Sequence, residues 1–250
     1  MVEVSIIIPC RNDKYLYNLF SDLNKQTFKD FEVILIPTKD EFKNFNTEKL
    51  SKIAKFKFKF VIADNPISNK RNKGIEKAEG RYIVLLDDDV RVLKKSWLKE
   101  LYNKIKNSKY DIIGGLLLEE IRVGETEALP SNNIIFRKDI YIPMDVNFRS
   151  VAQDTEWCFR MYKKGYKLYQ DCIAPVQHEK FSVKKRIRRC FLQGREWAHI
   201  IVKHGNMPWF KIERLVLSFF FRAFLEFLRF IGLCYGLLKY GFQCKILKKR

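Results

Sequence analysis

The chain has 250 residues, with 48 lysines and arginines against 29 aspartates and glutamates, which gives a formal net charge of +19. Hydrophobic residues make up 47% and aromatic residues 14%, enough apolar surface for a core, so a disordered basic chain is excluded. The six cysteines show no CxxC or paired spacing, which argues against a disulfide scaffold or zinc ribbon and for a reducing compartment. The MVEVSIIIPC start lacks the basic stretch of a signal peptide.

Apolar runs alternate with amphipathic stretches over the first 120 residues. The runs are short and nearly uninterrupted, as in strands buried in a parallel sheet, and the stretches place apolar residues at helical spacing. This alternation predicts βαβ units: an α/β fold with a mostly parallel sheet and helices on both faces. The predicted strands are Val4–Ile8, Phe31–Ile36, Phe56–Ile62, Tyr82–Leu86 and Tyr110–Leu118, and the predicted helices cover 13–26, 66–80 and 97–105.

The second half of the chain changes character twice. Residues 119–150 are polar and irregular, and a short helix is expected over Asp154–Lys164 before Gly165 ends it. From Phe181 onward the pattern is helical and basic. We expect one domain over residues 1–180 and a basic, aromatic helical extension over 181–250. Residues 179–250 carry 17 basic and 4 acidic residues, a net charge of +13.

Three adjacent carboxylates, Asp87, Asp88 and Asp89, follow the apolar run Tyr82–Leu86. Ligands of open α/β sheets bind at the carboxyl ends of strands. Side chains alternate along an extended backbone, so Asp87 and Asp89 point the same way and can hold a divalent cation, Mg²⁺ or Mn²⁺. A solvated acidic turn is the alternative. Upstream, helical spacing puts Ile67, Arg71 and Ile75 on one stripe, so Arg71 faces inward and needs a phosphate or a carboxylate as its partner.

Three segments together resemble family 2 glycosyltransferases over roughly residues 2–200. V-S-I-I-I-P-C-R-N at Val4–Asn12 resembles their opening strand, usually V-S-V-I-I-P-T-Y-N. K-R-N-K-G-I-E-K-A-E-G-R-Y-I at Lys70–Ile83 resembles A-R-N-x-G-I-x-x-A-x-G-x-Y-I, and L-L-D-D-D at Leu85–Asp89 is similar to F-L-D-x-D. The order and the spacing of the three motifs fit the family.

The resemblance implies a GT-A fold, Rossmann-like, that binds a nucleotide-diphospho-sugar across the carboxyl edge of the sheet with a divalent metal, Mn²⁺ or Mg²⁺. The donor-binding residues that it implies are Pro9, Arg11, Asn12, Asp64, Arg71, Asp87 and Asp88. The implied metal ligands are Asp87, Asp89 and His178, although a lone histidine is more often a structural hydrogen-bonding group. In the family the second strand ends in an Asp that reads the nucleobase. Here Pro37 follows that strand; Asp40 or Asp64 can substitute, and Asp64 is preferred because it ends the third strand.

Asp154 has two interpretations. By capping preferences it is a helix N-cap, with Glu156 in the first turn. By resemblance, Q-D-T-E-W-C-F-R at Gln153–Arg160 is similar to the family's E-D-x-E-x-x-x-R, whose Asp is the catalytic base, and Asp154 takes that role. Gln153 departs from the family's Glu, which lowers the local negative charge.

The predicted activity is inverting, metal-dependent transfer of a single sugar to a hydroxyl acceptor, a lipid-linked or cell-surface glycan precursor. Q-G-R-E-W at Gln193–Trp197 departs from the Q-x-x-R-W of processive members, which argues against a polymer-extruding synthase. A nucleotidyltransferase would need a glycine-rich phosphate loop after the first strand, which is missing. The sequence is also compatible with a catalytically impaired scaffold of the same fold and with a basic nucleic-acid-binding module.

The stretch Leu215–Tyr240 is apolar and aromatic, with one polar stripe formed by Arg222, Glu226 and Arg229. No uncharged run there approaches the roughly 18 residues that span a bilayer. We expect amphipathic helices that bind an anionic membrane surface, and a cytoplasmic enzyme peripheral to the inner face of the cell membrane. Packing on the catalytic domain or on a second subunit of an oligomer is the alternative.

Overall fold

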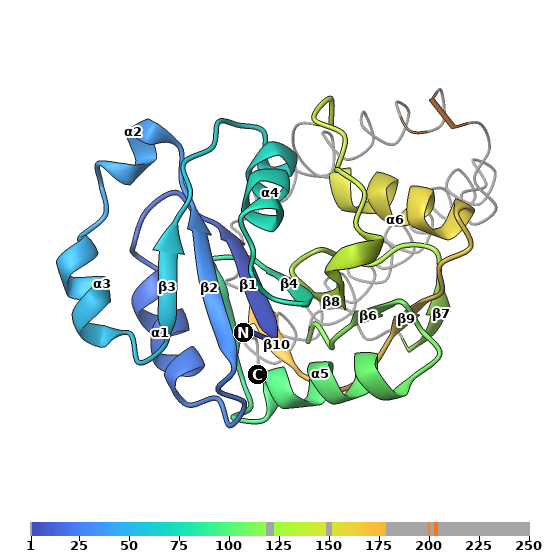
Figure 1. Ribbon diagram of the computed structural model, residues 1–250, viewed down its shortest axis with the longest axis horizontal. Coiled ribbons are helices and arrows are strands. Elements are labelled where there is room, and N and C mark those ends of the chain that lie inside the picture. The colour runs from blue at the N-terminus through green and yellow to red at the C-terminus, as the bar shows by residue number, and fades with distance from the viewer. Residues whose placement is uncertain (1, 119–122, 149–151, 179–199, 201–202, 205–250) are drawn as a thin grey trace, which may run out of the picture. The chain divides into compact units, whose positions relative to one another are not determined.

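An eight-stranded mixed sheet runs through the computed structural model, which describes residues 2–118, 123–148, 152–178, 200 and 203–204 (Figure 1). From left to right in Figure 1 the strand order is β3-β2-β1-β4-β8-β6-β9-β7, and β10 and β5 form a second, two-stranded sheet. The strands are β1 (Val4–Pro9), β2 (Phe31–Ile36), β3 (Lys57–Phe60), β4 (Tyr82–Leu86), β5 (Val90–Val92), β6 (Ile112–Gly114), β7 (Gly124–Thr126), β8 (Asn133–Arg137), β9 (Leu168–Gln170) and β10 (Val176–His178). The helices are α1 (Leu16–Asn24), α2 (Lys39–Phe42), α3 (Thr47–Ile53), α4 (Ile67–Glu76), α5 (Trp97–Asn107), the 3₁₀ turn η1 (Lys138–Ile140) and α6 (Gln153–Lys163).

The first half of the sheet is parallel, as the buried apolar runs predict. β1 pairs in parallel with both β2 and β4, and β2 pairs in parallel with β3. Every residue of β1, β2 and β4 is buried, because helices cover both faces of these strands. The strands β2 and β4 have the predicted bounds, and the α/β fold is confirmed.

Two apolar clusters form the core, one on each face of the sheet. Along β1, Val4, Ile6 and Ile8 belong to the cluster that includes buried residues of α1 and α5. Ile7 belongs to the cluster on the opposite face, with Ile75 of α4 and residues of α6. Successive side chains of a strand point to opposite faces, so one buried strand supplies both clusters. α4 is thereby fixed against β1 and β2, beside the edge where these strands end.

The interpretation of residues 119–150 as irregular is wrong for the edge strand β7 and for β8. The strand β8 has the greater effect on the site. This strand lies inside the sheet, antiparallel to β4 and to β6. Its apolar stretch of three residues, Ile134–Phe136, is too short to show a period. The helices α2 and α3 were also not predicted. The predicted strand Tyr110–Leu118 shrinks to β6, and β3 is shorter than the run that predicted it.

Several predictions lie outside the described residues. These are the domain boundary between 180 and 181, the segment Gln193–Trp197 and the stretch Leu215–Tyr240. Within the part of the chain that is described, none of the helices combines the length and the apolarity needed to cross a membrane.

Candidate functional site

An ion pair joins α4 to the end of β4. The Arg71 side chain is 1% exposed, and its Nη2 donates to Asp87 Oδ1 over 2.8 Å. Ile75, one helical turn further on, is also buried. The helical stripe thus turned Arg71 inward as predicted, and its partner is a carboxylate of the acidic triplet. A buried guanidinium needs such a partner because an isolated charge is costly to remove from water.

Asp87, Asp89 and His178 converge beyond the end of β4. One ligand atom of each lies within 4.8 Å of those of the other two. His178 Nδ1 is 3.2 Å from Asp89 Oδ1, and His178 Nε2 is 3.7 Å from Asp87 Oδ2. The pairing of β10 with β5 explains this contact, since His178 lies opposite Val90, the residue that follows Asp89.

Burial and mutual repulsion shift the acidic triplet. Burial raises the pKa of Asp87 above its ordinary value, against the opposing effects of the Arg71 and His178 charges. Burial also raises the pKa of Asp88 to about 7, and the carboxylates of Asp89 and Asp87 add to this rise. Each shift means that negative charge at this position is costly. A cation would relieve that cost, because a bound divalent ion is the largest local charge in such a site.

The donor set fits a divalent cation. Two carboxylates and one imidazole converge, and both types of group bind first-row divalent ions in proteins. The three side chains are each between 14% and 26% exposed, so water or substrate oxygens can complete the coordination shell. This arrangement supports Asp87, Asp89 and His178 as the candidate metal ligands.

Asp154 lies on the first turn of α6 and is not the helix N-cap. The cap position is occupied by Ala152, which has no capping side chain. The Asp154 carboxylate instead accepts from the backbone N–H and the hydroxyl of Ser131, both 3.2 Å from Oδ2, and from the Thr155 N–H at 2.8 Å. It lies close enough to the acidic triplet that its charge contributes to the raised pKa of Asp87. The capping interpretation is therefore wrong, and Asp154 lies within electrostatic range of the acidic triplet.

Of the other predicted donor-binding residues, Arg11 is the one that lines a cleft of about 720 Å³ in the described part of the chain. The Arg11 backbone N–H lies 3.4 Å from Asp88 Oδ2. Pro9 ends β1 and is buried, and Asn12 accepts from the Lys14 N–H. Asp64 is exposed and precedes Asn65 at the rim. Among the described residues, the lining consists of Arg11, Asn65, Pro66, Ile67, Asn69, Val146 and Asn147.

The two candidates for the nucleobase carboxylate differ in their surroundings. Asp40 lies on α2, fully on the surface, and pairs with Lys43 over 2.8 Å. Asp64 accepts through its backbone carbonyl from Asn69 Nδ2, and Asn69 also lines the cleft. Asp64 is thus linked through its backbone to a residue of the cleft, and its role as the nucleobase carboxylate stays a prediction.

The sequence analysis did not identify two polar residues that immediately precede β8. Ser131 holds Asp154, and Asn132 Nδ2 lies 2.8 Å from His178 Nε2. The antiparallel register sets Asn133 opposite Leu86, so the amino end of β8 meets the carboxyl end of β4. The polar triplet Ser131–Asn132–Asn133 before an apolar run was the available signal, but only an antiparallel strand brings it to this edge.

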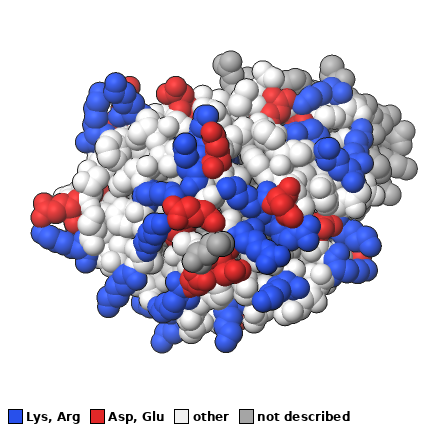
Figure 2. Space-filling model, in the orientation of Figure 1, with Lys and Arg blue, Asp and Glu red and all other residues white. Residues whose placement is uncertain are grey.

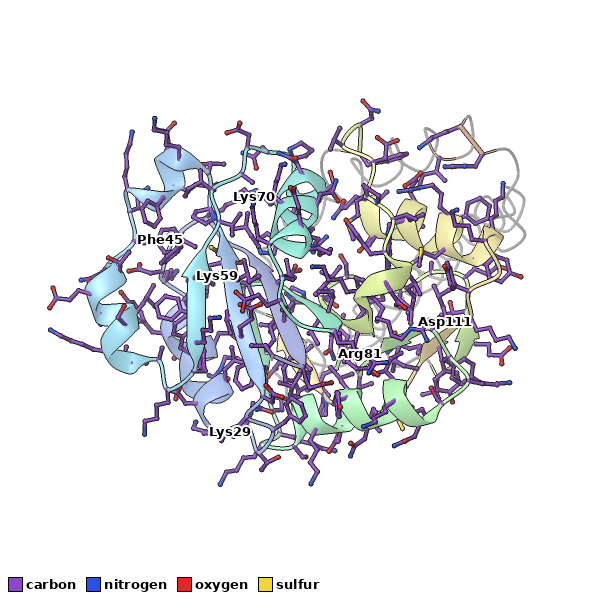
Figure 3. The ribbon with its side chains drawn as sticks, in the orientation of Figure 1. Lys29, Phe45, Lys59, Lys70, Arg81 and Asp111 are labelled. Atoms are coloured by element: carbon purple, nitrogen blue, oxygen red, sulfur yellow. The ribbon has the colours of Figure 1, made fainter. Side chains whose placement is uncertain are left out.

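A second unpredicted contact lies nearer the ends of β1 and β2. Lys70 of α4 is 3% exposed and points toward α2 (Figure 3). Its Nζ donates to the Cys10 carbonyl over 3.3 Å and pairs with the Glu41 carboxylate. Glu41 also completes a capping box with Thr38. The family motif quoted above has alanine at the position of Lys70, so the motif did not point to this pair.

A family model described as glycosyl transferase family 2 matches residues 5–202. Among curated proteins, glycosyltransferase GlyG of Streptococcus pneumoniae is 27% identical over 124 residues, which cover 45% of this chain and 38% of the relative. The GalNAc(5)-diNAcBac-PP-undecaprenol beta-1,3-glucosyltransferase of Campylobacter jejuni is 28% identical over 125 residues, 48% of this chain and 40% of the relative. The chain thus matches less than half the length of these relatives.

Among solved structures, the mannosyltransferase PcManGT from Pyrobaculum calidifontis, in complex with GDP-Man and Mn²⁺, superposes with a TM-score of 0.65 at 12% identity. The match covers 82% of this chain and 66% of that one. At such low identity the likeness shows the fold, and the expected GT-A fold is confirmed. The family model covers well over half of the sequence and includes the three motifs apart from Val4. The chain belongs to glycosyltransferase family 2.

Proposed function

We propose that the protein transfers a single sugar, with inversion, from a nucleotide-diphospho-sugar to a hydroxyl group of a lipid-linked or cell-surface glycan precursor. The observation that carries this proposal is that a candidate metal site and a candidate general base lie at the same edge of the sheet. A cation-binding donor set, Asp87, Asp89 and His178, lies beside a carboxylate, Asp154, that two groups of Ser131 hold in place.

In this proposal Asp154 is the general base. Its carboxylate takes the proton of the acceptor hydroxyl as the oxygen attacks the anomeric carbon, on the face opposite the leaving diphosphate. Ser131 keeps Oδ2 oriented by two hydrogen bonds. Arg71 holds Asp87 in place and balances its charge. Asp87, Asp89 and His178 would hold the Mn²⁺ or Mg²⁺ ion, which when bound neutralises charge on the leaving diphosphate.

The cleft beside Arg11 is proposed to take the nucleotide of the donor. It opens between the loop after β1 and the start of α4, and Arg11 joins it to Asp88. The solved relative that binds GDP-Man and Mn²⁺ supports a nucleotide-sugar donor with a divalent cation. Both guanine and uracil remain candidates for the base, because Pro37 replaces the family's base-reading Asp.

A lipid-linked acceptor is proposed on two grounds. The Campylobacter relative, by its name, acts on an undecaprenol diphosphate-linked glycan. The segment 181–250 of this chain is basic and rich in aromatic residues, a composition suited to the surface of an anionic membrane. We therefore place the enzyme on the inner face of the cell membrane, where such acceptors and nucleotide-sugars meet.

The test begins with a panel of UDP- and GDP-sugars, with and without Mn²⁺. A donor that binds only the folded protein raises its Tm. The selected donor is then supplied with polyprenyl-diphosphate-linked acceptors, and transfer is measured for the wild-type protein and for Asp154→Asn. The exposed Asp139→Asn, which pairs only with Arg137 among the described residues, is the matched control.

We expect Asp154→Asn to lower kcat by about 10²–10⁴-fold, the usual contribution of a general base, while donor-dependent stabilisation persists. Asp139→Asn should transfer at the wild-type rate. Near wild-type transfer by Asp154→Asn would overturn the assignment of the base. Failure of every nucleotide-sugar to stabilise the protein or to be consumed would overturn the proposed function.

A further inference from the structure

Asn132 lies beside the metal-ligand candidates without belonging to them. The residue immediately precedes β8, its side chain is 8% exposed, and its amide Nδ2 is 2.8 Å from His178 Nε2. With the amide nitrogen toward the ring, as here, Asn132 Oδ1 is buried and has no hydrogen-bond partner among the described residues. Burying a carbonyl oxygen without a hydrogen-bond partner is unfavourable, because the oxygen loses its bonds to water.

The two nitrogens of a neutral imidazole have opposite roles. One carries the proton and donates; the other has the lone pair that can bind a metal. His178 Nε2 faces Asn132, and His178 Nδ1 lies 3.2 Å from Asp89 Oδ1. If His178 binds the cation through Nδ1, the proton of the neutral ring must lie on Nε2. The Nε2–H group then needs an acceptor, and the group in that position is the Asn132 amide.

Rotation of the amide by half a turn supplies that acceptor. The two ends of an asparagine amide occupy nearly the same volume, so rotation exchanges donor and acceptor without new space. Asn132 Oδ1 then accepts from Nε2–H, and the amide nitrogen takes the former position of the oxygen. Metal-bound histidines commonly donate their second N–H in this way, and the acceptor fixes both tautomer and ring orientation.

We propose that Asn132 is a positioning residue that accepts from His178 Nε2–H and so reserves Nδ1, beside Asp89, for the divalent cation. This inference rests on the proposed metal-dependent function. It assigns Asn132 no contact with the substrate. The effect is expected in cation affinity, which is measured on the full chain in the absence of any donor or acceptor.

The first experiment measures Mn²⁺ binding by electron paramagnetic resonance of the free ion. Asn132→Leu keeps the side-chain volume and removes both hydrogen-bonding ends, and we expect its Mn²⁺ Kd to be about 10–100-fold weaker. Asn132→Asp keeps only the acceptor and should bind at least as tightly as wild type. Asn103→Leu, exposed on α5, is the matched control, and Asp87→Ala reports loss of the site itself.

The second experiment requires no variant at the tested position. The chain has three histidines, so a long-range ¹H–¹⁵N spectrum contains few imidazole signals, and His178→Gln assigns the one of interest. In Mg²⁺-saturated protein we expect His178 to be the Nε2–H tautomer. This readout stays decisive even if Asn132→Leu fails to fold, which a lowered Tm would reveal.

The outcomes separate the two levels of the inference. If Asp87→Ala loses Mn²⁺ and Asn132→Leu binds like wild type, the role of Asn132 is wrong and the metal site stands. The role of Asn132 is also overturned if Asn132→Asp weakens Mn²⁺ binding as much as Asn132→Leu does. The same holds if His178 is the Nδ1–H tautomer in Mg²⁺-saturated protein. If the wild-type protein takes up no Mn²⁺, the metal site of the proposed function is wrong and the role of Asn132 is overturned with it.

Discussion

Ser131 shows how a single side chain can set the geometry of a proposed base. Its hydroxyl is one of two Ser131 groups that donate to Asp154 Oδ2, and the residue is 2% exposed. Without the hydroxyl, the backbone N–H still holds the carboxylate, but less firmly. A hydrogen bond of this kind contributes about 1 kcal/mol, or roughly a fivefold change in rate if all of it acts on the transition state.

We expect Ser131→Ala to lower kcat about fivefold with little change in the donor KM. Ser96→Ala is the matched control, since the Ser96 hydroxyl contacts Glu100 at the start of α5. Steady-state kinetics with the donor varied separates the two constants. A raised donor KM at unchanged kcat would instead place Ser131 in donor binding and contradict its role in orienting Asp154.

The residues of the site differ in how far the sequence predicted them. The acidic triplet and Arg71 were predicted from local spacing, because a strand end and a helical stripe are both properties of a few consecutive residues. Asp154 and His178 entered through the family resemblance. Ser131 and Asn132 were not predicted, because each acts through a partner that is distant in sequence.

At the scale of elements, α4 connects the core to the site. Gly74 allows this helix to approach the sheet closely: a Cβ atom there would lie 2.7 Å from Ile7 Cγ2 and 2.8 Å from Ile36 Cδ1. Arg71 lies on the preceding turn and would move with the helix. The position of the Arg71–Asp87 pair therefore depends on the absence of a side chain at residue 74.

Gly74→Ala should destabilise the protein although alanine is the better helix former. Overpacking costs about 1–3 kcal/mol, against a gain of about 1 kcal/mol in helix propensity. We expect a net loss of up to about 2 kcal/mol in the free energy of unfolding, measured with urea. Lys73→Ala, half-exposed on the same helix, should change it by no more than about 0.5 kcal/mol. A Gly74→Ala protein at least as stable as wild type would show that the helix is not so closely packed.

The pair of Glu41 and Lys70 ties α2 to α4 and makes a pH-dependent contribution to stability. Burial alone would raise the pKa of Glu41, but hydrogen bonds from Lys70 and from the Thr38 backbone lower it below its ordinary value of 4.5. A lowered pKa means that the folded state favours the charged carboxylate. This contribution is complete well above pH 4.5 and is lost as the pH falls below 4.5 through the lowered value.

Glu41→Gln removes the charge and keeps the shape of the side chain. At pH 7 we expect it to lower the free energy of unfolding by about 2 kcal/mol, as for a hydrogen bond to a charged group. The difference from wild type should shrink as the pH falls below 4.5. Glu48→Gln breaks a fully exposed pair with Lys52 and should have little effect at either pH. A Glu41→Gln difference that is independent of pH would contradict this assignment.

Elements with a clear period were predicted well, and short elements were not. β2 and β4 were predicted with their observed bounds because each is an apolar run, broken only by Glu32 in β2. β5 and β10 have three residues each, too few to show any alternation. Their pairing nevertheless carries His178 to Asp89.

At the scale of the whole molecule, the net charge of +19 is unevenly distributed along the sequence. On the face shown in Figure 2, basic side chains are interspersed with acidic ones across the described residues. Residues 179–250, by contrast, carry a net charge of +13. This distribution is the reason why the proposed contact with an anionic membrane surface is assigned to the C-terminal segment.

Replacement of four basic residues near the C-terminus by glutamine should weaken binding to phosphatidylserine vesicles at least tenfold. The reason is that each basic residue near such a surface contributes about 1 kcal/mol to binding. Sedimentation of the full chain with vesicles measures this. The substituted residues are Lys245, Lys248, Lys249 and Arg250.

A matched variant loses an equal number of positive charges from exposed positions of the catalytic part. The two variants then have the same net charge and differ only in where the charges were removed. Its substituted residues are Lys29, Lys55, Lys99 and Lys106. Equal weakening by both variants would show that net charge alone governs binding. Steep, salt-dependent binding of oligonucleotides that only the C-terminal variant loses would favour a nucleic-acid-binding role for this segment.

The sequence by itself determined the features that depend on neighbours along the chain. The alternation of strand and helix, the three carboxylates after a buried strand and the inward side of α4 all follow from local periodicity. The tertiary structure alone decided which distant residues meet. β8 inserts antiparallel beside β4, and β10 pairs with β5, so that Ser131, Asn132 and His178 reach the acidic triplet. Strand pairing is set by long-range hydrogen bonds and by packing on both faces, and strands of three to five residues carry too little pattern to reveal it.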